Sequence, residues 1–395
     1  MPAHYLPQMY LKRFLRDNRL HVYDRVLKQL RLDGLQSVAT ISDYYVMTDP
    51  DGGRDDSVES RLLSEIETKA TPVLDALAKC ESITDTQWDI AGIFLALLCT
   101  RVPAFEQAYT QIGEDLLKLT MRRLAGTPAL AADLLARRRG SPSISPNALA
   151  HFVSEGNYSV RPHPNSRIQA MLDMAEPLIS AFGDMDWWLL RNDGQARFIT
   201  SDGPMGFVPQ ENAPPTYGER TSTVLKFVAL SPDVCLMLCD KAGERPRLAI
   251  KAIDSDDVAG INARIARAAT RLVIGRDRED VERVIAATDL AASDFIPSTR
   301  IVEWHDPALN QSITVGHRVH YDTRYPIRQQ WPWSCKSCGA TSAVTFVIAS
   351  PTTAQDPAFY TEWLDTPCQG CGNTPRSTQT FLTDSGFNMS RTEGW

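Results

Sequence analysis

The fold is organised around the stretch Arg197-Phe198-Ile199-Thr200-Ser201-Asp202-Gly203-Pro204-Met205. Its first half is rich in β-forming residues from Phe198 to Thr200, and it then changes to Ser-Asp-Gly, which are turn residues. Pro204 cannot continue a central strand because it has no backbone N–H to donate. The stretch therefore predicts a strand that ends in a polar turn and presents the carboxylate of Asp202 at the strand's end.

The neighbouring segments predict an antiparallel sheet. Met185–Leu190 and Ala196–Thr200 lie on either side of an Asn-Asp-Gly sequence at 192–194, which is a hairpin signal. Val224–Leu230 and Val234–Leu238 predict two more strands, joined by a Ser-Pro-Asp turn.

Helical spacing dominates the chain before this sheet. Apolar residues recur with a period close to four from Ser57 to Phe182, with helix starts at Ser57, Thr84 and Pro103. The predicted fold class is α+β, a mostly helical bundle packed on a small antiparallel sheet and followed by a small β zinc-ribbon domain. The predicted boundaries are 1–295 for the α+β domain, 296–330 for a connecting segment and 331–395 for the ribbon.

The composition excludes several classes of protein. With 395 residues, of which 43% are hydrophobic, the chain can bury a full core. Lys and Arg number 41 against 48 Asp and Glu, so the net charge of −7 argues against a chain-wide coat for nucleic acid or an anionic membrane. The longest apolar run, Ile93–Cys99, is far shorter than the roughly 20 residues that a membrane helix needs. We expect a cytoplasmic protein without a membrane segment.

Two Cys-x-x-Cys pairs predict a structural zinc site in the C-terminal part. The four thiolates suit tetrahedral Zn²⁺ and leave no position for a substrate water, and they are Cys335, Cys338, Cys368 and Cys371. The β-type run Ser342–Ile348 lies between the two knuckles, and Thr378–Leu382 after the second knuckle can pair with it. Because the core of this domain is so small, we expect the metal to supply much of its folding energy.

The charge of the ribbon favours a protein or intrachain contact over nucleic acid. From Trp331 onward there are three basic and five acidic side chains, which is a poor footprint for phosphate. The first domain differs, because residues 12–31 carry seven Lys and Arg against two Asp. This N-terminal excess is the best electrostatic candidate for a phosphate-bearing partner, although a solvated helix face and hairpin explain it equally well.

Two motifs resemble a large bacterial family that is known only as a domain of unknown function. The first runs from His4 to Phe14 (His-Tyr-Leu-Pro-Gln-Met-Tyr-Leu-Lys-Arg-Phe) and resembles H-Y-x-P-Q-x-Y-L-x-x-F. The second, Phe198–Pro204, resembles F-x-T-S-D-x-P, with Gly203 where the family more often has asparagine. The resemblance covers roughly residues 1–290 and implies a shared site without implying a reaction.

The resemblance carries a set of polar residues onto this chain. We predict a catalytic group, and around it a substrate-binding group to which the neighbouring cations Lys12 and Arg13 are added. The catalytic group is His4, Glu67, Arg101 and Asp202, and the binding group is Gln8, Ser201, Asn262, Lys12 and Arg13. A histidine and two carboxylates suit a divalent metal such as Mg²⁺, or general acid and base. An arginine and an asparagine suit a phosphate or an oxyanion.

Two functional hypotheses follow from this set. The first is an enzyme that acts on phosphodiesters of RNA or nucleotides, such as an RNase-like toxin or a phage-defence effector. The chain has no dinucleotide, Walker or nucleophile-elbow motif, which argues against those chemistries. The second is a non-catalytic binding protein whose bundle and zinc ribbon form a recognition surface. For several residues a structural role is an equal alternative: His4 bonding a backbone carbonyl, Glu67 with Arg101 as one ion pair, and Asp202 capping its own turn.

Overall fold

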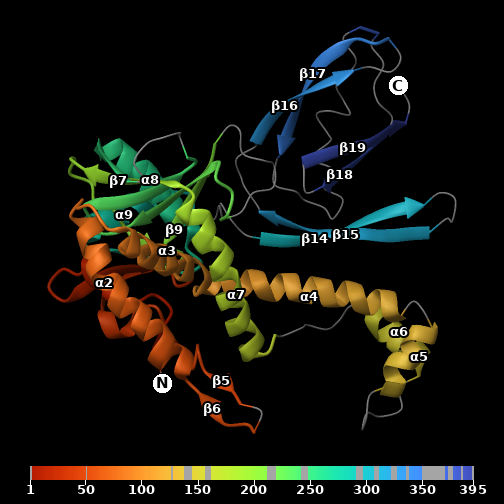
Figure 1. The fold of residues 1–395 in the computed structure, drawn as a ribbon, viewed down its shortest axis with the longest axis horizontal. Helices are drawn as coiled ribbons and strands as arrows, with labels where there is room; N and C mark the ends of the chain where they lie inside the picture. Colours follow the sequence, from red (N-terminus) through yellow and green to blue (C-terminus); the bar gives the residue numbers. More distant parts are fainter. Residues whose placement is uncertain are drawn as a thin grey trace.

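The computed structural model places a five-stranded and a four-stranded β-sheet, with two small two-stranded ones, among helices in the first 290 residues (Figure 1). It describes residues 2–49, 51–125, 128–137, 145–155, 162–210, 219–241, 248–290, 297–306, 311–321, 327–334, 338–348, 370–371, 377–383 and 386–393. The mixture of helices with mainly antiparallel sheets confirms the predicted α+β class.

The larger sheet has five strands in the order β12-β7-β11-β10-β9. Their bounds are Leu248–Ile253 for β12, Asp186–Asn192 for β7, Val234–Cys239 for β11, Val224–Ala229 for β10 and Met205–Pro209 for β9. β10 and β11 form the predicted hairpin, with Lys226 opposite Leu238. All neighbours are antiparallel except β12, which pairs parallel with β7 and was not predicted.

The smaller sheet has four strands in the order β3-β2-β13-β8. Their bounds are Gln29–Gly34 for β3, Arg19–Asp24 for β2, Leu272–Gly275 for β13 and Thr200–Ser201 for β8. β8 is the edge strand of this sheet, whereas β9, which follows it in the chain, is the edge strand of the larger sheet. The turn at 202–204 is therefore the point where the chain leaves one sheet and enters the other.

The hairpin predicted around the Asn-Asp-Gly sequence is wrong. β7 pairs with β11 and β12, and β8 pairs with β13. The local turn does form, because the Asn192 side chain accepts from the N–H of Gly194 (2.8 Å) and donates to the carbonyl of Ala196. It turns the chain away from β7 instead of back along it, so the next strand joins the other sheet.

The helices cover the sheets and extend away from them (Figure 1). Their bounds are Gln8–Leu11 for α1, Ser64–Ala78 for α2, Asp85–Thr100 for α3, Pro103–Ala125 for α4, Pro128–Arg137 for α5, Pro146–Glu155 for α6, Pro164–Gly183 for α7, Ser255–Ala268 for α8 and Arg278–Ala287 for α9. α3 begins at the helix start predicted at Thr84, and Thr84 forms a capping box with Gln87 there. α3 packs along α7, and Trp88 of α3 stacks on Trp187 of β7 with ring centroids 4.0 Å apart.

Short elements complete the fold before residue 290, and three hairpins follow among the described residues. The short elements are β1 (Pro2–His4), η1 (Lys12–Phe14), η2 (Leu35–Ser37), β4 (Thr40–Ser42), β5 (Met47–Thr48), β6 (Arg54–Asp55) and the π-helical η3 (Val58–Leu63). The hairpins pair β14 (Pro297–Asp306) with β15 (Gln311–Tyr321), β16 (Ile327–Ser334) with β17 (Thr341–Ile348), and β18 (Ser377–Thr383) with β19 (Gly386–Glu393). Among the described strands, β17 pairs with β16 and β18 with β19, and a pairing of Ser342–Ile348 with Thr378–Leu382 is not among these.

No single helix of the described chain is both long and apolar enough to cross a membrane. The pair formed by α3 and the Pro103–Glu114 part of α4 meets the same test of length and composition, with a bend of 60° between the two. Most residues of α3 are buried against the rest of the fold, as a core helix requires.

Candidate functional site

His4 lies at the end of β1, where the chain turns into α1. Its Nε2 lies 3.2 Å from the carbonyl oxygen of Leu35, and its Nδ1 lies 3.3 Å from Nε2 of Gln8. Because a carbonyl can only accept, the proton belongs on Nε2, and Nδ1 carries the lone pair that accepts from the Gln8 amide. The Gln8 amide also bonds the exposed Gln36 (3.4 Å), so the imidazole opens toward a polar surface.

Arg101 joins the other predicted residues to His4. Its Nη1 donates to Oε1 of Glu67 (2.8 Å), its Nη2 donates to the carbonyl oxygen of His4 (2.9 Å), and its Nε donates to the hydroxyl of Tyr45 (3.1 Å). The Arg101 side chain is 4% exposed and that of Glu67 is 25% exposed. A guanidinium this deeply buried cannot clamp a phosphate, so Arg101 positions Glu67 and the backbone of His4 instead.

The electrostatics of this cluster push two groups toward their neutral forms. Burial lowers the pKa of the His4 imidazole below its usual value of 6.5, and the charge of Arg101 lowers it further. Burial also raises the pKa of Glu59, and the charge of Glu67 adds to this effect. A neutral imidazole is a base, and a carboxyl that keeps its proton to higher pH is an acid.

Glu59 was not among the predicted residues, and its local structure explains why. It lies eight positions before Glu67, which in a regular α-helix separates two side chains by about 80° around the axis. The π-helical turn at Val58–Leu63 is wider than an α-helical turn and reduces this offset. Both carboxyl groups consequently interact with Arg101. The only sequence signal for Glu59 was its spacing of eight residues from Glu67. Without knowledge of the π-helical turn, this spacing places the two side chains on different faces of a helix.

Asp202 has a different environment. Its Oδ1 accepts from the N–H of Thr270 (2.9 Å), and its Oδ2 accepts from the Thr270 hydroxyl (2.8 Å) and the N–H of Arg271 (2.8 Å). The residue is 1% exposed, and burial raises the pKa of its carboxyl. Among the described contacts, no hydrogen bond or ion pair links Asp202 to His4, Glu67 or Arg101. The Asp202 carboxylate anchors the turn after α8. From the sequence, a catalytic role was predicted for it instead.

Ser201 and Asn262 also bind the backbone. The Ser201 hydroxyl contacts the carbonyl oxygens of Gly203 (2.7 Å) and Ile265 (3.0 Å). The Asn262 amide of α8 accepts from the N–H of Ile199 (3.0 Å) and donates to the carbonyl of Arg197 (2.8 Å). Both side chains are buried, and both connect the segment 197–203 to α8. Neither of them therefore belongs to the cluster around His4.

The predicted basic stretch is largely paired within the protein. Arg13 donates to the carbonyls of Met9 and Thr71 and to Asp75 (2.7 Å), although it was predicted to bind substrate. Arg16, Arg25 and Arg31 likewise have partners, which are Asp277, the carbonyls of Ala269 and Leu290, and Asp24 with Asp33. Lys12 is exposed and lies about one helical turn after Gln8, so it remains available to an anion.

The two predicted motifs do meet, through Tyr10 of the first motif, which was not among the predicted site residues. The Tyr10 hydroxyl lies 2.7 Å from Oγ1 of Thr200 and donates to the carbonyl of Ala229 (2.8 Å). Tyr10 is fully buried, so this contact between α1, β8 and β10 belongs to the core. The contact ties the N-terminal segment to both sheets.

A protein-family model described as a protein of unknown function, DUF4238, matches residues 3–279. The chain belongs to the DUF4238 family. The matched DUF4238 region contains the whole cluster around His4, the turn at Asp202 and Asn262, and its extent agrees with the predicted one. The four cysteines lie beyond its end. No curated protein and no solved structure matches the chain.

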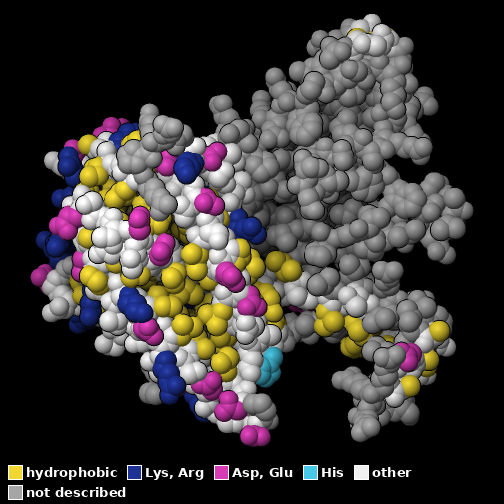
Figure 2. Space-filling view, in the orientation of Figure 1, with side chains coloured by type: hydrophobic (Ala, Val, Ile, Leu, Met, Phe, Trp, Pro, Cys, Tyr) yellow, Lys and Arg dark blue, Asp and Glu magenta, His cyan; other side chains and the backbone are white. Residues whose placement is uncertain are grey.

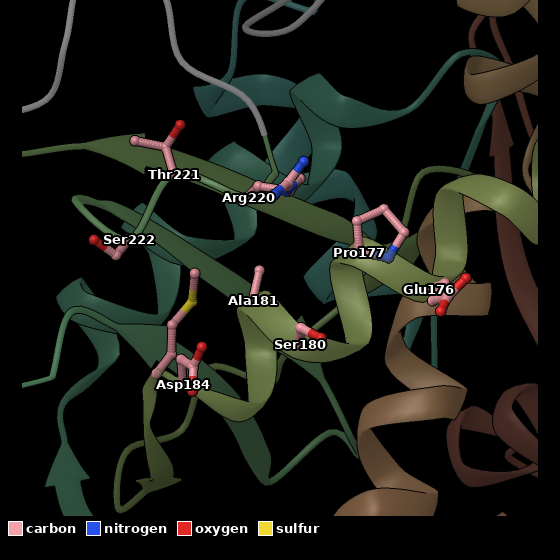
Figure 3. Close-up of a pocket in the computed structure, with 9 residues that line it drawn as sticks. Glu176, Pro177, Ser180, Ala181, Asp184, Arg220, Thr221 and Ser222 are labelled. Carbon is pink, nitrogen blue, oxygen red and sulfur yellow. The ribbon is translucent and has the colours of Figure 1, made fainter. Parts of the chain in front are cut away.

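Two hollows of the DUF4238 region lie along α7. One is an open depression of about 900 Å³ between the second half of α7 and the segment 220–222 (Figure 3). Figure 3 shows Pro177, Ser180 and Ala181 on the helix and Arg220 on the segment opposite. The other is a cavity of about 660 Å³ beside the first half of α7, lined in part by Gly203, Pro204 and Met205. The second motif of the DUF4238 resemblance therefore contributes to a cavity wall.

Metal ligands were predicted both in the cluster and in the ribbon. Among the residues that the structure describes, no group of three or more His, Cys, Asp or Glu side chains lies close enough to hold a metal ion. Cys335 and Cys368 lie outside the described residues, while Cys338 and Cys371 are exposed. Cys338 lies in the turn between β16 and β17, and Gly339 beside it has a φ of +73°, a left-handed conformation that glycine adopts readily.

Proposed function

We propose that this DUF4238 chain is an enzyme that acts on phosphodiester bonds of RNA or nucleotides, as an RNase-like toxin or phage-defence effector in the cytoplasm. The observation that supports it is the arrangement at Arg101. One buried guanidinium holds both the carboxylate of Glu67 and the backbone of His4, beside a polar, partly open surface. His4 thus has a fixed position and a neutral ring.

In this proposal His4 is the general base. Its Nδ1 lone pair takes the proton of an attacking hydroxyl once that hydroxyl replaces the Gln8 amide. Glu59, whose pKa is raised by burial, gives a proton to the leaving oxygen. Lys12 and Gln8 supply the exposed contacts to the phosphate, since Arg13, Arg101 and Asn262 are occupied within the fold.

The test is turnover of pooled labelled RNA, DNA and nucleotides by the full chain, with and without Mg²⁺. We expect His4→Ala to lower the rate by about 100-fold or more, the usual contribution of a general base. His151→Ala is the matched control, because it removes an exposed imidazole from α6, far along the chain from the cluster. Circular dichroism and the melting temperature check that both variants fold.

Either of two results would reject parts of this proposal. Turnover that persists in His4→Ala would remove the site assignment. No turnover of any pool would favour the alternative, a non-catalytic binding protein. The internal pairing of Arg13, Arg16, Arg25 and Arg31 supports that alternative, since it leaves few cations for phosphate.

We further propose that the four cysteines hold a structural zinc ion and that the ribbon serves a protein contact. The support is the Cys-x-x-Cys spacing, the placement of Cys338 in a hairpin turn and the left-handed Gly339. Metal analysis of the purified chain should find one zinc per chain, and Cys338→Ser should lose it. Cys80→Ser, at a cysteine outside the two pairs, is the control and should keep the zinc. A zinc content near zero in the wild-type chain would contradict this proposal.

A further inference from the structure

The cavity beside the first half of α7 has the size of a small-molecule site. Its volume of about 660 Å³ lies within the roughly 300–1,000 Å³ of ligand pockets. The end of α3, the first turns of α4 and the start of β9 line it with α7. In the sequence, Arg101 lies between two residues that line the cavity, Leu98 and Val102. Its side chain, however, donates to Glu67 and does not line the cavity, so the cavity is separate from the cluster around His4.

Most of the lining is apolar and aromatic. Phe105 and Tyr109 of α4 stack with nearly parallel rings, at an interplanar angle of 7°. Met174 of α7 and Met205 of β9 contribute thioethers, which adapt to apolar guests. Met174 is a 44% exposed apolar residue, and Figure 2 shows hydrophobic side chains gathered over the region of α3 and α7. Water in the cavity makes few hydrogen bonds to such apolar walls, so its displacement by an apolar ligand would be favourable.

One wall of the cavity is fixed by the turn after β8. At Gly203 an added Cβ would lie 2.3 Å from the carbonyl oxygen of Ala268, so the turn lies directly against α8. Ser201 holds this approach through the carbonyls of Gly203 and Ile265, and Asp202 holds the chain that follows α8. A cavity with such a wall is largely formed before any ligand enters, which lowers the cost of binding.

The charges of the lining are all of one sign. Among the described residues that line the cavity, Asp173 and Glu219 are acidic and no Lys, Arg or His is present. Lys226 is close enough to affect Glu219 electrostatically, but its ammonium donates to the carbonyls of Thr221 and Val224. Burial raises the pKa of the Glu219 carboxyl, and the charge of Lys226 offsets this rise only in part. A ligand that brings a positive charge into the cavity would place a second cation beside this carboxyl, on the side that the lining leaves without one.

We propose that this cavity binds a small apolar molecule that carries a basic amine. The ammonium group lies at Glu219 with Asp173 at the rim, and the apolar part fills the space between Phe105, Tyr109 and Met205. Charge complementarity selects the amine, because an alcohol gains only a neutral hydrogen bond there and a carboxylate meets two negative charges. This function is independent of the proposed phosphodiester chemistry.

The test uses three probes of one shape: 4-phenylbutylamine, 4-phenylbutanol and 4-phenylbutyrate. Isothermal titration with the full chain should show the amine binding about tenfold or more tightly than the alcohol, and the carboxylate most weakly. Glu219→Gln keeps the shape of the side chain and should remove the preference for the amine. Ala108→Trp should fill the cavity and weaken all three probes. His4→Ala should bind the amine as the wild type does.

Equal binding of the amine and the alcohol by the wild-type chain would overturn the proposal, as would an unchanged preference in Glu219→Gln. Ala170→Phe fills the same cavity from α7, so it replaces Ala108→Trp if that variant fails to fold. Tight amine binding in both cavity-filling variants would place the probe elsewhere and would also overturn the proposal. The His4→Ala arm separates this result from the nuclease test, because loss of turnover there leaves the binding data unchanged.

Discussion

Glu67 and Asp202 are two carboxylates that were predicted for one site, and the structure gives them different surroundings. Asp202 is 1% exposed, and three donors from the loop after α8 occupy its two oxygens. Glu67 is 25% exposed, and one nitrogen of Arg101 occupies one of its oxygens. A fully occupied buried carboxylate stabilises the fold, whereas a partly open one has lone pairs left for a ligand. The comparison separates a structural motif from a chemical one within the same family resemblance.

The largest effect should come from the closed carboxylate. Asp202→Ala leaves the N–H groups of Thr270 and Arg271 and the Thr270 hydroxyl without their acceptor, which we expect to lower the free energy of unfolding by about 3–5 kcal/mol. Chemical denaturation measures this change. Tyr10→Phe is the matched control, because it removes one buried hydroxyl from the same core and should cost only about 1 kcal/mol.

The opposite outcome for Asp202→Ala would be informative. A variant that keeps the wild-type denaturation midpoint and loses only turnover would return Asp202 to the catalytic group. The distinction between the closed and the open carboxylate would then fail. A loss of both stability and turnover would agree with an anchoring role, since the turn at Gly203 depends on the same loop.

The difference between the two carboxylates could not be predicted from sequence, because the partners of Asp202 lie about seventy positions later in the chain. The turn chemistry at Ser201–Pro204 was predictable from local residue types, and a turn is what the structure shows. The partner strand of β8 was not predictable, since Leu272–Gly275 carries no local signal for that pairing. The Asn-Asp-Gly residues predicted a turn correctly, but they did not indicate which strands pair on either side of it. Register and pairing depend on burial across the whole sheet.

The cluster itself was partly predictable. His4, Gln8, Glu67 and Arg101 came from the family resemblance, and the structure brings them together. Their individual roles were not visible, because a sequence does not show that Arg101 is buried. Only the fold shows that the hydroxyl of Tyr45 lies at the guanidinium of Arg101. Glu59 was missed because the π-helical turn changes the angular spacing that helix patterns assume.

The smallest effect concerns pH and tests the electrostatics of the open site. The folded state keeps the His4 pKa below 6.5, so between that lower pKa and pH 6.5 the unfolded chain binds more protons. Stability should therefore rise with pH through this window and level off above 6.5, and His4→Gln should lose this dependence. The acid limb of any pH–rate profile should likewise fall below 6.5. Denaturation midpoints from pH 5 to pH 8 measure the difference between the two chains.

Glu59 sharpens this test because its effect on the pH dependence of stability has the opposite sign to that of His4. Its pKa is raised above the usual 4.5, so the folded chain binds more protons just above that pH, and stability should fall as pH rises through the folded pKa. Glu59→Gln should remove this fall while keeping the rise that belongs to His4. If the two variants change the pH dependence in the same direction, the acid and base roles assigned to this pair are wrong. If His4→Gln leaves the profile unchanged, the imidazole is already solvated like that of an exposed histidine, and the open site has no tuned base.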